Sequence, residues 1–430
     1  MLENAQAHQI DTNTRDKWKN ATEWPGLGRK LRILVAPANK GGCSFYRAWN
    51  PFEKVQELYS GAVEFRFNEN PLNIDREKMV ESEEKEDLDW CDVFFTQNLA
   101  NFGGPATIRY VGLAKEKGKF VWYDTDDLLT NIYDDHRLKG VYEQNNLQEI
   151  TKAIYHHSDL VSVTQHKFAE RIYPYCTANL VVLKNQIDYS LPAWNRPKQY
   201  IQTKKDRVKV GWVAGIHHEA DIKEFARVPA FVNKRVGTKR IFWGMYGRPP
   251  VDPNWTEEQK QKEKWQQDVW DNYVRTFKTG MTGKDNNVMV YNALPSTHYG
   301  MMYTNIDLSI APLQNNEFND SKSDIKVAEC GRYKVPLVAT DVGCYSDTIK
   351  NGETGYLISP DAPPSEWVRV LTKMAKDPLW VKEMGENLHQ ITERDFSLEK
   401  NVHIRLDVLE HSMKGWVQNK AKEEGYEPQV

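Results

Sequence analysis

The sequence predicts an α/β fold with two doubly wound parallel-sheet domains that face each other across a cleft. Three observations lead to this prediction. The 430 residues exceed the length of one typical domain. Short apolar runs alternate with helical patterns from residue 31 to residue 185. The alternation stops in a polar, Pro-containing segment and restarts at Arg207, so a second sheet of the same kind is expected.

The first predicted domain consists of short apolar strands bounded by Lys, Gly, Asn or Asp, with helices between them. We expect strands over residues 31–37, 63–69, 89–98, 119–127, 159–165 and 179–185. We expect helices over residues 105–119, 147–159 and 166–176, and within residues 39–58 after a glycine loop. This order predicts a parallel sheet that is covered on both faces.

The second predicted domain repeats this order with one interruption. Strands are expected over residues 207–215, 239–247, 287–292, 305–313 and 335–340, and a helix is expected over residues 220–235. Between the second and third of these strands, Trp265, Val269 and Tyr273 recur at helical spacing. We interpret residues 252–280 as a surface helix inserted in the second domain.

These segments predict the following domain organisation. It consists of a polar N-terminal arm (1–29), a first domain (30–190), a linker (191–206), a second domain (207–384) with a helical insertion at about 252–280, and C-terminal helices (385–430).

Composition excludes several classes of protein. The net charge of −3 gives no overall basic footprint for nucleic acid. The five cysteines have no CxxC spacing, which argues against a zinc site and against a disulfide scaffold. The N-terminus lacks an apolar signal core, and no run approaches the roughly 20 apolar residues of a membrane span. We therefore expect a soluble protein in a reducing cytoplasm.

The segment from Ala311 to Tyr356 carries the strongest functional signal. Lys322, Lys326 and Glu329 have the spacing of one helix face, and Ser321 or Ser323 could cap that helix. A helix N-terminus with two cations can hold a phosphate, and a carboxylate one turn further on could hold a sugar hydroxyl. The pattern favours a nucleotide-sugar site, and the alternative is a solvated lysine face.

Two glycine loops follow the first strands of the two domains. Gly41 and Gly42 precede a helix and would let a ligand approach the backbone closely. Gly215 closes the first strand of the second domain, with His217 and His218 directly after it. A doubled histidine is not a metal site by itself, so contact with phosphate or sugar is the preferred interpretation.

Three carboxylates, Asp124, Asp126 and Asp127, end the strand at 119–127. A haloacid-dehalogenase-like phosphatase would use Asp124 and Asp126 as nucleophile and general acid. A metal-dependent transferase of the GT-A type would use them to hold Mn²⁺ or Mg²⁺. The phosphatase pattern normally lies on the opening strand, whereas three strands are predicted before this one. Contact with the acceptor or the sugar, and capping of the strand end, are the other interpretations.

The order of parts in the second domain resembles the retaining glycosyltransferases of the GT-B fold, of the family-4 type. Their pattern K-S-x-x-K-x-x-E, followed by Pro-x-Val-Ala-Thr/Ser-Asp-Val-Gly and N-G-x-x-G, is matched by Lys322, Ser323, Lys326, Glu329, Pro336, Val338, Ala339, Asp341, Val342, Gly343, Asn351, Gly352 and Gly355. The resemblance implies two Rossmann-like domains, the first on the acceptor side and the second binding the nucleotide-sugar. It also implies transfer from a donor such as a UDP-sugar to a hydroxyl, with retention of configuration and without metal or cofactor.

The resemblance also implies roles for individual residues. Lys326, Lys322 and Asp124 are the expected catalytic residues, with both lysines stabilising the leaving diphosphate. The expected donor-binding residues are Gly41, Gly42, Gly215, His218, Ser323 and Glu329. The expected acceptor contacts are Tyr46, Arg47, Asp126 and Asp127.

One position departs from the family. Ser321 stands where the family often has a first glutamate, which contacts the transferred sugar, and Glu317 or Asp320 could substitute for it. A glycosyltransferase-like binding module without catalysis is therefore the alternative to an enzyme.

The arm and the Trp-rich insertion resemble phage-encoded and bacterial glycosyltransferases. The acceptor is then a hydroxymethylated base in phage DNA, or otherwise a glycan, a protein or a small molecule. A phage enzyme would act in the host cytoplasm. The candidate DNA contacts are Arg15, Lys17, Lys19, Arg29, Lys30, Lys204, Lys205 and Arg207.

Overall fold

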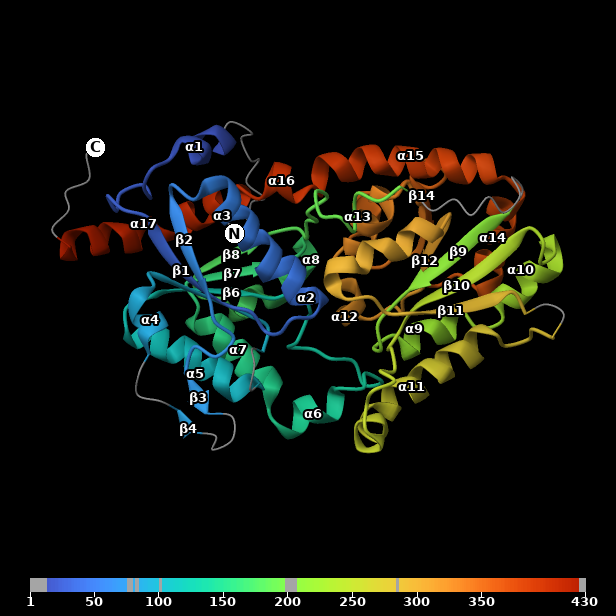
Figure 1. The fold of residues 1–430 in the computed structure, drawn as a ribbon, viewed down its shortest axis with the longest axis horizontal. Helices are drawn as coiled ribbons and strands as arrows, with labels where there is room; N and C mark the ends of the chain where they lie inside the picture. Colours follow the sequence, from blue (N-terminus) through green and yellow to red (C-terminus); the bar gives the residue numbers. More distant parts are fainter. Residues whose placement is uncertain are drawn as a thin grey trace.

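The protein folds into two α/β domains, each built on a six-stranded parallel sheet (Figure 1). This computed structural model describes residues 14–75, 80–81, 85–99, 103–197, 207–283 and 286–424. The strand orders are β2-β1-β5-β6-β7-β8 and β11-β10-β9-β12-β13-β14. In each sheet, the strands that follow along the chain are added first on one side of the earliest strand, β1 or β9, and then on its other side, as in doubly wound folds. The predicted fold class is confirmed.

In the first domain, the central strands carry apolar side chains on both faces of the sheet. The sheet consists of β1 (Leu31–Ala36), β2 (Val63–Phe67), β5 (Val93–Gln97), β6 (Phe120–Asp124), β7 (Leu160–Val163) and β8 (Asn179–Val182). Every residue of β5, β6 and β7 is buried, as expected for a sheet that is covered on both faces. The helices are α2 (Gly42–Ser44), α3 (Asn50–Tyr59), α4 (Glu86–Trp90), α5 (Gly103–Glu116), α6 (Lys139–Gln144), α7 (Leu147–His157) and α8 (His166–Ile172).

The second domain has the same architecture. Its sheet consists of β9 (Val208–Val213), β10 (Ile241–Arg248), β11 (Val288–Asn292), β12 (Leu308–Ala311), β13 (Leu337–Thr340) and β14 (Gly355–Ile358). Its helices are α9 (Glu219–Glu224), α10 (Val228–Val236), α11 (Glu257–Phe277), α12 (Glu317–Asp320), α13 (Ile325–Arg332), α14 (Pro364–Lys376) and α15 (Pro378–Asp395). Strand β14, four residues long at the edge of the sheet, was not predicted from the sequence. The helix expected over 220–235 is two helices, and Pro229 lies in the first turn of the second one.

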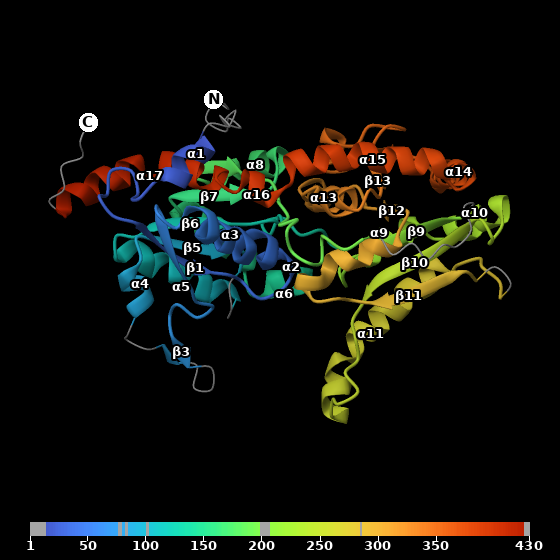
Figure 2. The ribbon, with the colours of Figure 1, turned by 45° about the horizontal axis from the view of Figure 1, so that its top comes forward.

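Helix α11 is not an insertion, which corrects the interpretation of residues 252–280. It connects β10 to β11, which are parallel neighbours, so it is the regular crossover helix between them. Trp270, Tyr273 and Phe277 in its last two turns are fully buried in the core. Its N-terminal turns project beyond the sheet (Figure 2), and Trp265 there is 39% exposed. A capping box at Thr256 begins the helix.

The N-terminal segment is packed rather than free, which corrects the interpretation of residues 14–29 as an arm. Helix α1 (Thr14–Asn20) places Trp18 in the core, and Trp24 follows it there. The indole of Trp18 donates to Asp407 Oδ1 at 2.7 Å. Residues 1–13 lie outside the described residues.

The C-terminal helices cross from the second domain to the first (Figure 1). Helix α15 packs on α13, whereas α16 (Leu398–Asn401) and α17 (Ile404–Glu423) join the core beneath β1 and α3. Leu406 and Leu409 contribute to that core with at most 2% exposure. The predicted helical tail is confirmed, and it joins the two domains along one side.

The first part of the expected linker is also packed, because Trp194 is 1% exposed among Tyr189, Tyr303 and Tyr333. Residues 198–206 lie outside the described residues. In the part of the chain that the structure describes, no helix has both the length and the apolar character of a membrane span.

Candidate functional site

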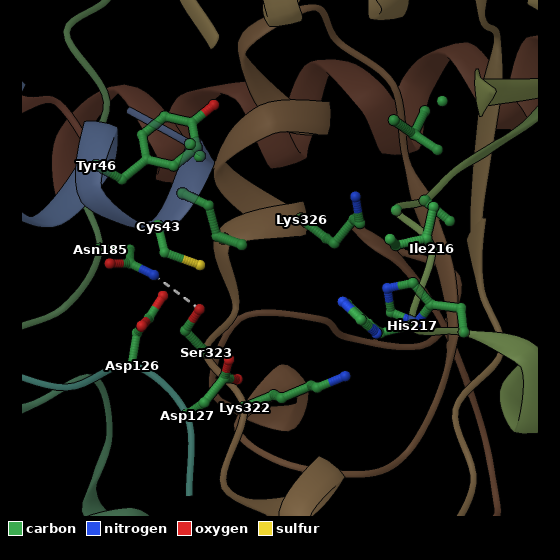
Figure 3. A pocket seen from close by; sticks show the side chains of 18 of the residues that line it. Cys43, Tyr46, Asp126, Asp127, Asn185, Ile216, His217, Lys322, Ser323 and Lys326 are labelled. Carbon is green, nitrogen blue, oxygen red and sulfur yellow. Dashed lines mark hydrogen bonds between the residues drawn. The ribbon is translucent and has the colours of Figure 1, made fainter. Parts of the chain in front are cut away.

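A cavity of about 840 Å³ lies between the domains, at the carboxyl ends of both sheets (Figure 3). Connections after β1, β5, β6, β9 and β12 line it together with helix α13. Eleven of the thirteen predicted site residues line this cavity: Gly41, Gly42, Tyr46, Asp126, Asp127, Gly215, His218, Lys322, Ser323, Lys326 and Glu329. The doubly wound topology explains why residues so far apart in sequence meet here.

Arg47 and Asp124 are the two predicted site residues that do not line the cavity. Their side chains are 0% and 1% exposed and form a two-pronged ion pair, with Nη2 to Oδ2 at 2.5 Å and Nε to Oδ1 at 2.9 Å. Ser162 Oγ donates to the same carboxylate. The expectations of an acceptor contact for Arg47 and a catalytic role for Asp124 are therefore corrected, because both groups are saturated by protein partners.

This ion pair also argues against the phosphatase alternative. A nucleophilic Asp124 would need to face a substrate, and its carboxylate is instead held by Arg47 and Ser162 inside the domain. Moreover, three strands of the same sheet, β1, β2 and β5, precede β6 along the chain, whereas that motif lies on an opening strand.

The two glycine loops leave room on the cavity side. A Cβ atom placed at Gly42 or Gly215 would meet no atom within 4 Å, so packing inside the protein does not demand glycine at either position. The space in front of the backbone belongs to the cavity. Both loops are thus open to close approach by a ligand.

The first-domain wall of the cavity is acidic. One potential ligand atom each from Cys43, Asp126 and Asp127 lies within 4.8 Å of the others, which is the one such group of three among the described residues. Asn98 Nδ2 donates to Asp126 at 2.8 Å. Burial and the neighbouring Asp126 raise the pKa of Asp127 to about 7, against the effect of Lys322. These three residues could hold a cation.

The second-domain wall is cationic, but its helix begins later than predicted. Helix α13 starts at Ile325 with Asp324 as N-cap, and no side-chain capping bond forms. Lys322 therefore lies in the preceding loop, with its ammonium 5.2 Å from the ring centre of Phe318. Ser323 is not a cap, and its hydroxyl accepts from Asn185 Nδ2 of the first domain at 2.8 Å.

Helix α13 places Lys326 and Glu329 side by side at the cavity. Lys326 Nζ lies 3.5 Å from Glu329 Oε2 and 3.3 Å from the hydroxyl of Tyr299. Burial lowers the pKa of Lys326, but Tyr299 and Glu329 together outweigh burial and raise it. Lys326 is therefore a fixed positive charge at any physiological pH.

Glu329 is engaged by two tyrosines. Tyr303 donates to Oε2 at 2.6 Å, and Tyr46 of the first domain donates to Oε1 at 3.4 Å. The carboxylate is only 3% exposed. A ligand hydroxyl that binds Glu329 must share it with Tyr46 or displace Tyr46.

Two histidines follow Gly215. His218 Nδ1 lies 2.8 Å from Asp221 Oδ2, a carboxylate that is 1% exposed. The ring of His217 stacks on His136 of the first domain, with 5.7 Å between the centroids. Burial, followed by His217 and Lys322, lowers the pKa of His136 to about 4, so His136 is neutral at pH 7.

The position of the family's first glutamate does not face the cavity. Ser321 is fully buried, donates to Glu317 O and accepts from Arg171 of α8. Asp320 is paired with Arg171 at 2.6 Å and Lys167 at 2.9 Å, so it joins the domains. Glu317 accepts from Asn131. Neither carboxylate lines the cavity as a substitute.

Sequence reasoning missed several cavity residues and their supports, namely Asp221, Asn185, Tyr299, Tyr303 and His136. Asp221 stands three residues after His218 and could have been found from that spacing. The others come from distant segments and carry no local signal.

We expect Asp124→Ala to reduce the free energy of unfolding by about 3–5 kcal/mol, because it leaves the buried Arg47 guanidinium unpaired. Asp126→Ala is the matched control at the same strand end and should cost less than about 1 kcal/mol. Urea unfolding of both variants measures the difference. Equal losses would contradict the structural role of Asp124.

Asp324 predicts a pH dependence of stability. Its carboxylate is 1% exposed, its oxygens accept no hydrogen bond from another described residue, and burial raises its pKa to about 6. Because this folded-state pKa lies above the unfolded value, the residue costs stability as pH rises from about 4 through 6.

We therefore expect Asp324→Asn to gain stability relative to the original chain between pH 4.5 and pH 8, by an amount on the order of 3 kcal/mol at most. Thermal unfolding across that range measures it. The exposed Asp361→Asn is the control and should show no such trend. A stability difference that does not vary with pH would refute the argument.

Comparisons with known proteins agree with this geometry. Residues 268–377 match the family model "Glycosyl transferases group 1". No curated protein matches the chain. Among solved structures, sucrose-phosphate synthase from Thermosynechococcus elongatus is similar, with a TM-score of 0.61 and 13% identity over 90% of this chain and 100% of that one.

Two further solved structures share the fold. HepE from Anabaena, in complex with UDP and glucose, has a TM-score of 0.56 and 12% identity over 88% of this chain and 99% of that one. The α,α-trehalose 6-phosphate synthase from Burkholderia multivorans has a TM-score of 0.56 and 9% identity over 90% and 99%. The chain thus has the GT-B fold, and the segment that matches the glycosyltransferase family model carries both lysines and Glu329.

Proposed function

We propose that the protein transfers a sugar from a nucleoside-diphosphate sugar, such as a UDP-sugar, to an acceptor hydroxyl, with retention of configuration and without metal. The observation that carries this proposal is the convergence of Lys322, Lys326 and Glu329 with both glycine loops in one cavity. Two lysines at a backbone-lined wall suit a diphosphate, and the adjacent carboxylate suits ribose hydroxyls. The HepE structure contains UDP and glucose, which supports the same class of donor.

The reaction breaks the bond between the sugar carbon and the diphosphate oxygen and forms a bond from that carbon to the acceptor oxygen. The departing diphosphate oxygen takes the electron pair of the broken bond and gains negative charge, and the proton of the acceptor hydroxyl passes to that oxygen or to solvent. In this proposal Lys322 and Lys326, which both line the cavity, stabilise that charge as it develops.

The structure also bears on the alternative of a non-catalytic binding module. That alternative was based on Ser321, but Ser321 is buried behind α12 and has no access to the cavity. A serine at this position therefore removes no group from the site as it stands. We favour an enzyme for this reason.

We expect Lys326→Met to lower the rate of sugar transfer by about 100-fold or more, because one charge on the leaving diphosphate is lost. Hydrolysis and transfer assays with a panel of UDP-, GDP- and ADP-sugars measure this. Ser321→Ala should stay within a few-fold of the unaltered protein. Nucleotide binding without any turnover would support the binding module, and absence of nucleotide binding would refute both readings.

For the acceptor we favour a hydroxyl-rich glycan over DNA. Asp126 and Asp127 make the first-domain wall acidic, and carboxylates accept hydrogen bonds from sugar hydroxyls but repel phosphates. Two predicted DNA contacts are already neutralised, since Lys17 pairs with Glu410 and Arg29 pairs with Asp92 and Glu424. Lys204 and Lys205 lie outside the described residues.

Transfer to an oligosaccharide panel, to hydroxymethylated duplex DNA and to unmodified duplex DNA separates these acceptors. We expect transfer to an oligosaccharide and none to either DNA. Transfer to hydroxymethylated DNA alone would restore the phage-DNA hypothesis, with the host cytoplasm as the place of action. All five cysteines are unpaired, which is compatible with a reducing compartment such as the cytoplasm.

A further inference from the structure

The histidine after the second glycine loop is part of a buried pair. His218 Nδ1 and Asp221 Oδ2 lie 2.8 Å apart. Asp221 is 1% exposed and also accepts from the backbone of Gln314 at 2.8 Å and from Asn319 Nδ2 at 3.0 Å. These bonds keep Asp221 ionised, so Nδ1 of His218 carries a proton and donates it to the carboxylate.

The other ring nitrogen is free for a ligand. No hydrogen bond joins His218 Nε2 to any residue that the structure describes, and the side chain lines the cavity with 23% exposure. The loop is fixed by Tyr273 of α11, whose hydroxyl accepts from the backbone N–H of His218 at 3.0 Å and donates to Ile216 O at 2.7 Å. The imidazole is thus held in one tautomer beside the cavity.

The charged neighbours of His218 come from four segments. They are His217, Glu219 and Asp221 on its own loop and helix, Lys322 before α13, Lys326 on α13, and His136 and Arg137 of the first domain near His217. Burial lowers the pKa of His218, Asp221 raises it, and Lys322 and Lys326 lower it. The pKa of His218 thus lies below its usual value, and the imidazole is neutral at pH 7.

We propose that His218 and Asp221 form a proton-coupled ligand for the donor diphosphate. His218 Nε2 takes up one proton from solvent when the nucleotide binds, and the resulting N–H donates a hydrogen bond to a phosphate oxygen. No bond of the donor changes in this step, and Asp221 stays ionised opposite the imidazolium. This inference rests on the proposed nucleoside-diphosphate donor.

The physical reason is that the bound diphosphate changes the sign of the electrostatic potential that acts on His218. Before binding, the two lysines oppose a third positive charge in the same wall. A diphosphate brings negative charges that offset both lysines, so protonation of His218 becomes favourable and adds a third cation. The affinity for the donor then depends on pH. It weakens as pH rises, because binding takes up a proton and the concentration of protons in solution falls.

Calorimetry of UDP binding in two buffers of different ionisation enthalpy tests this, at pH 8, where UDP is fully ionised. We expect the unaltered protein to take up between about 0.5 and 1 proton per UDP, and its Kd to rise up to tenfold per pH unit above pH 7. His218→Gln should bind UDP more weakly with almost no proton uptake. His218→Arg should bind with a Kd that does not change between pH 7 and pH 8.5.

Two controls separate this proposal from a structural role. His217→Gln lies on the same loop but stacks on His136, so it should retain the proton uptake. Asp221→Asn should abolish it, and if that variant fails to fold, His218→Gln alone decides. Equal uptake in His218→Gln, or loss of uptake in His217→Gln instead, overturns the inference. UDP binding without proton uptake overturns only the inference, whereas no binding of UDP, GDP or ADP overturns the donor proposal as well.

Discussion

The buried ion pair between Arg47 and Asp124 is the interaction on which the first-domain half of the cavity depends. Arg47 lies on a π-helical turn (Phe45–Trp49) directly after the glycine loop, and Asp124 ends β6. The same guanidinium donates to Leu183 O at 2.5 Å and to Asn185 Oδ1 at 3.2 Å, beyond β8. One side chain therefore fixes the π-helical turn and the ends of β6 and β8 relative to one another. Breaking a pair of this kind is costly because the remaining charge is stranded in low dielectric.

From the Arg47–Asp124 ion pair, polar contacts continue into the second domain. Asn185, which Arg47 positions, donates to Ser323, and Tyr46 from the same π-helical turn donates to Glu329. Asp320 adds ion pairs to α8. Beside an apolar cluster that joins Phe45 and Tyr46 to residues of the second domain, the two walls of the cavity are thus held together by polar contacts. Such contacts can exchange with ligand hydroxyls and phosphates at a small net cost, which suits a site that must open and close around its substrate.

The sequence was sufficient to predict the fold class, most strands and eleven residues of the cavity, because apolar periodicity and glycine-bounded turns are local signals. It was not sufficient for α11, whose polar N-terminal turns hid a crossover helix anchored by Trp270 and Phe277. It also mistook residues 14–29 for an arm, because their apolar partners lie almost 400 residues later in α17. Asp124 was misjudged for a similar reason, since a carboxylate at a strand end looks the same whether it faces a cavity or a buried arginine.

The departure at Ser321 is explained by how the domains are joined. In this chain the residues before α13 are used for packing: Ser321 and Asp320 bind Arg171, and Gly343 approaches Asp320 through its backbone N–H with a positive φ of 74°. A glutamate at position 321 would place a longer, charged side chain in a fully buried space. The cavity instead has an acidic wall on the first domain and a cationic wall on the second. Because each wall is attached to a different sheet, the charge separation needed to hold a diphosphate opposite a hydroxyl is set by how the two domains meet, and a single side chain at position 321 is not required for it.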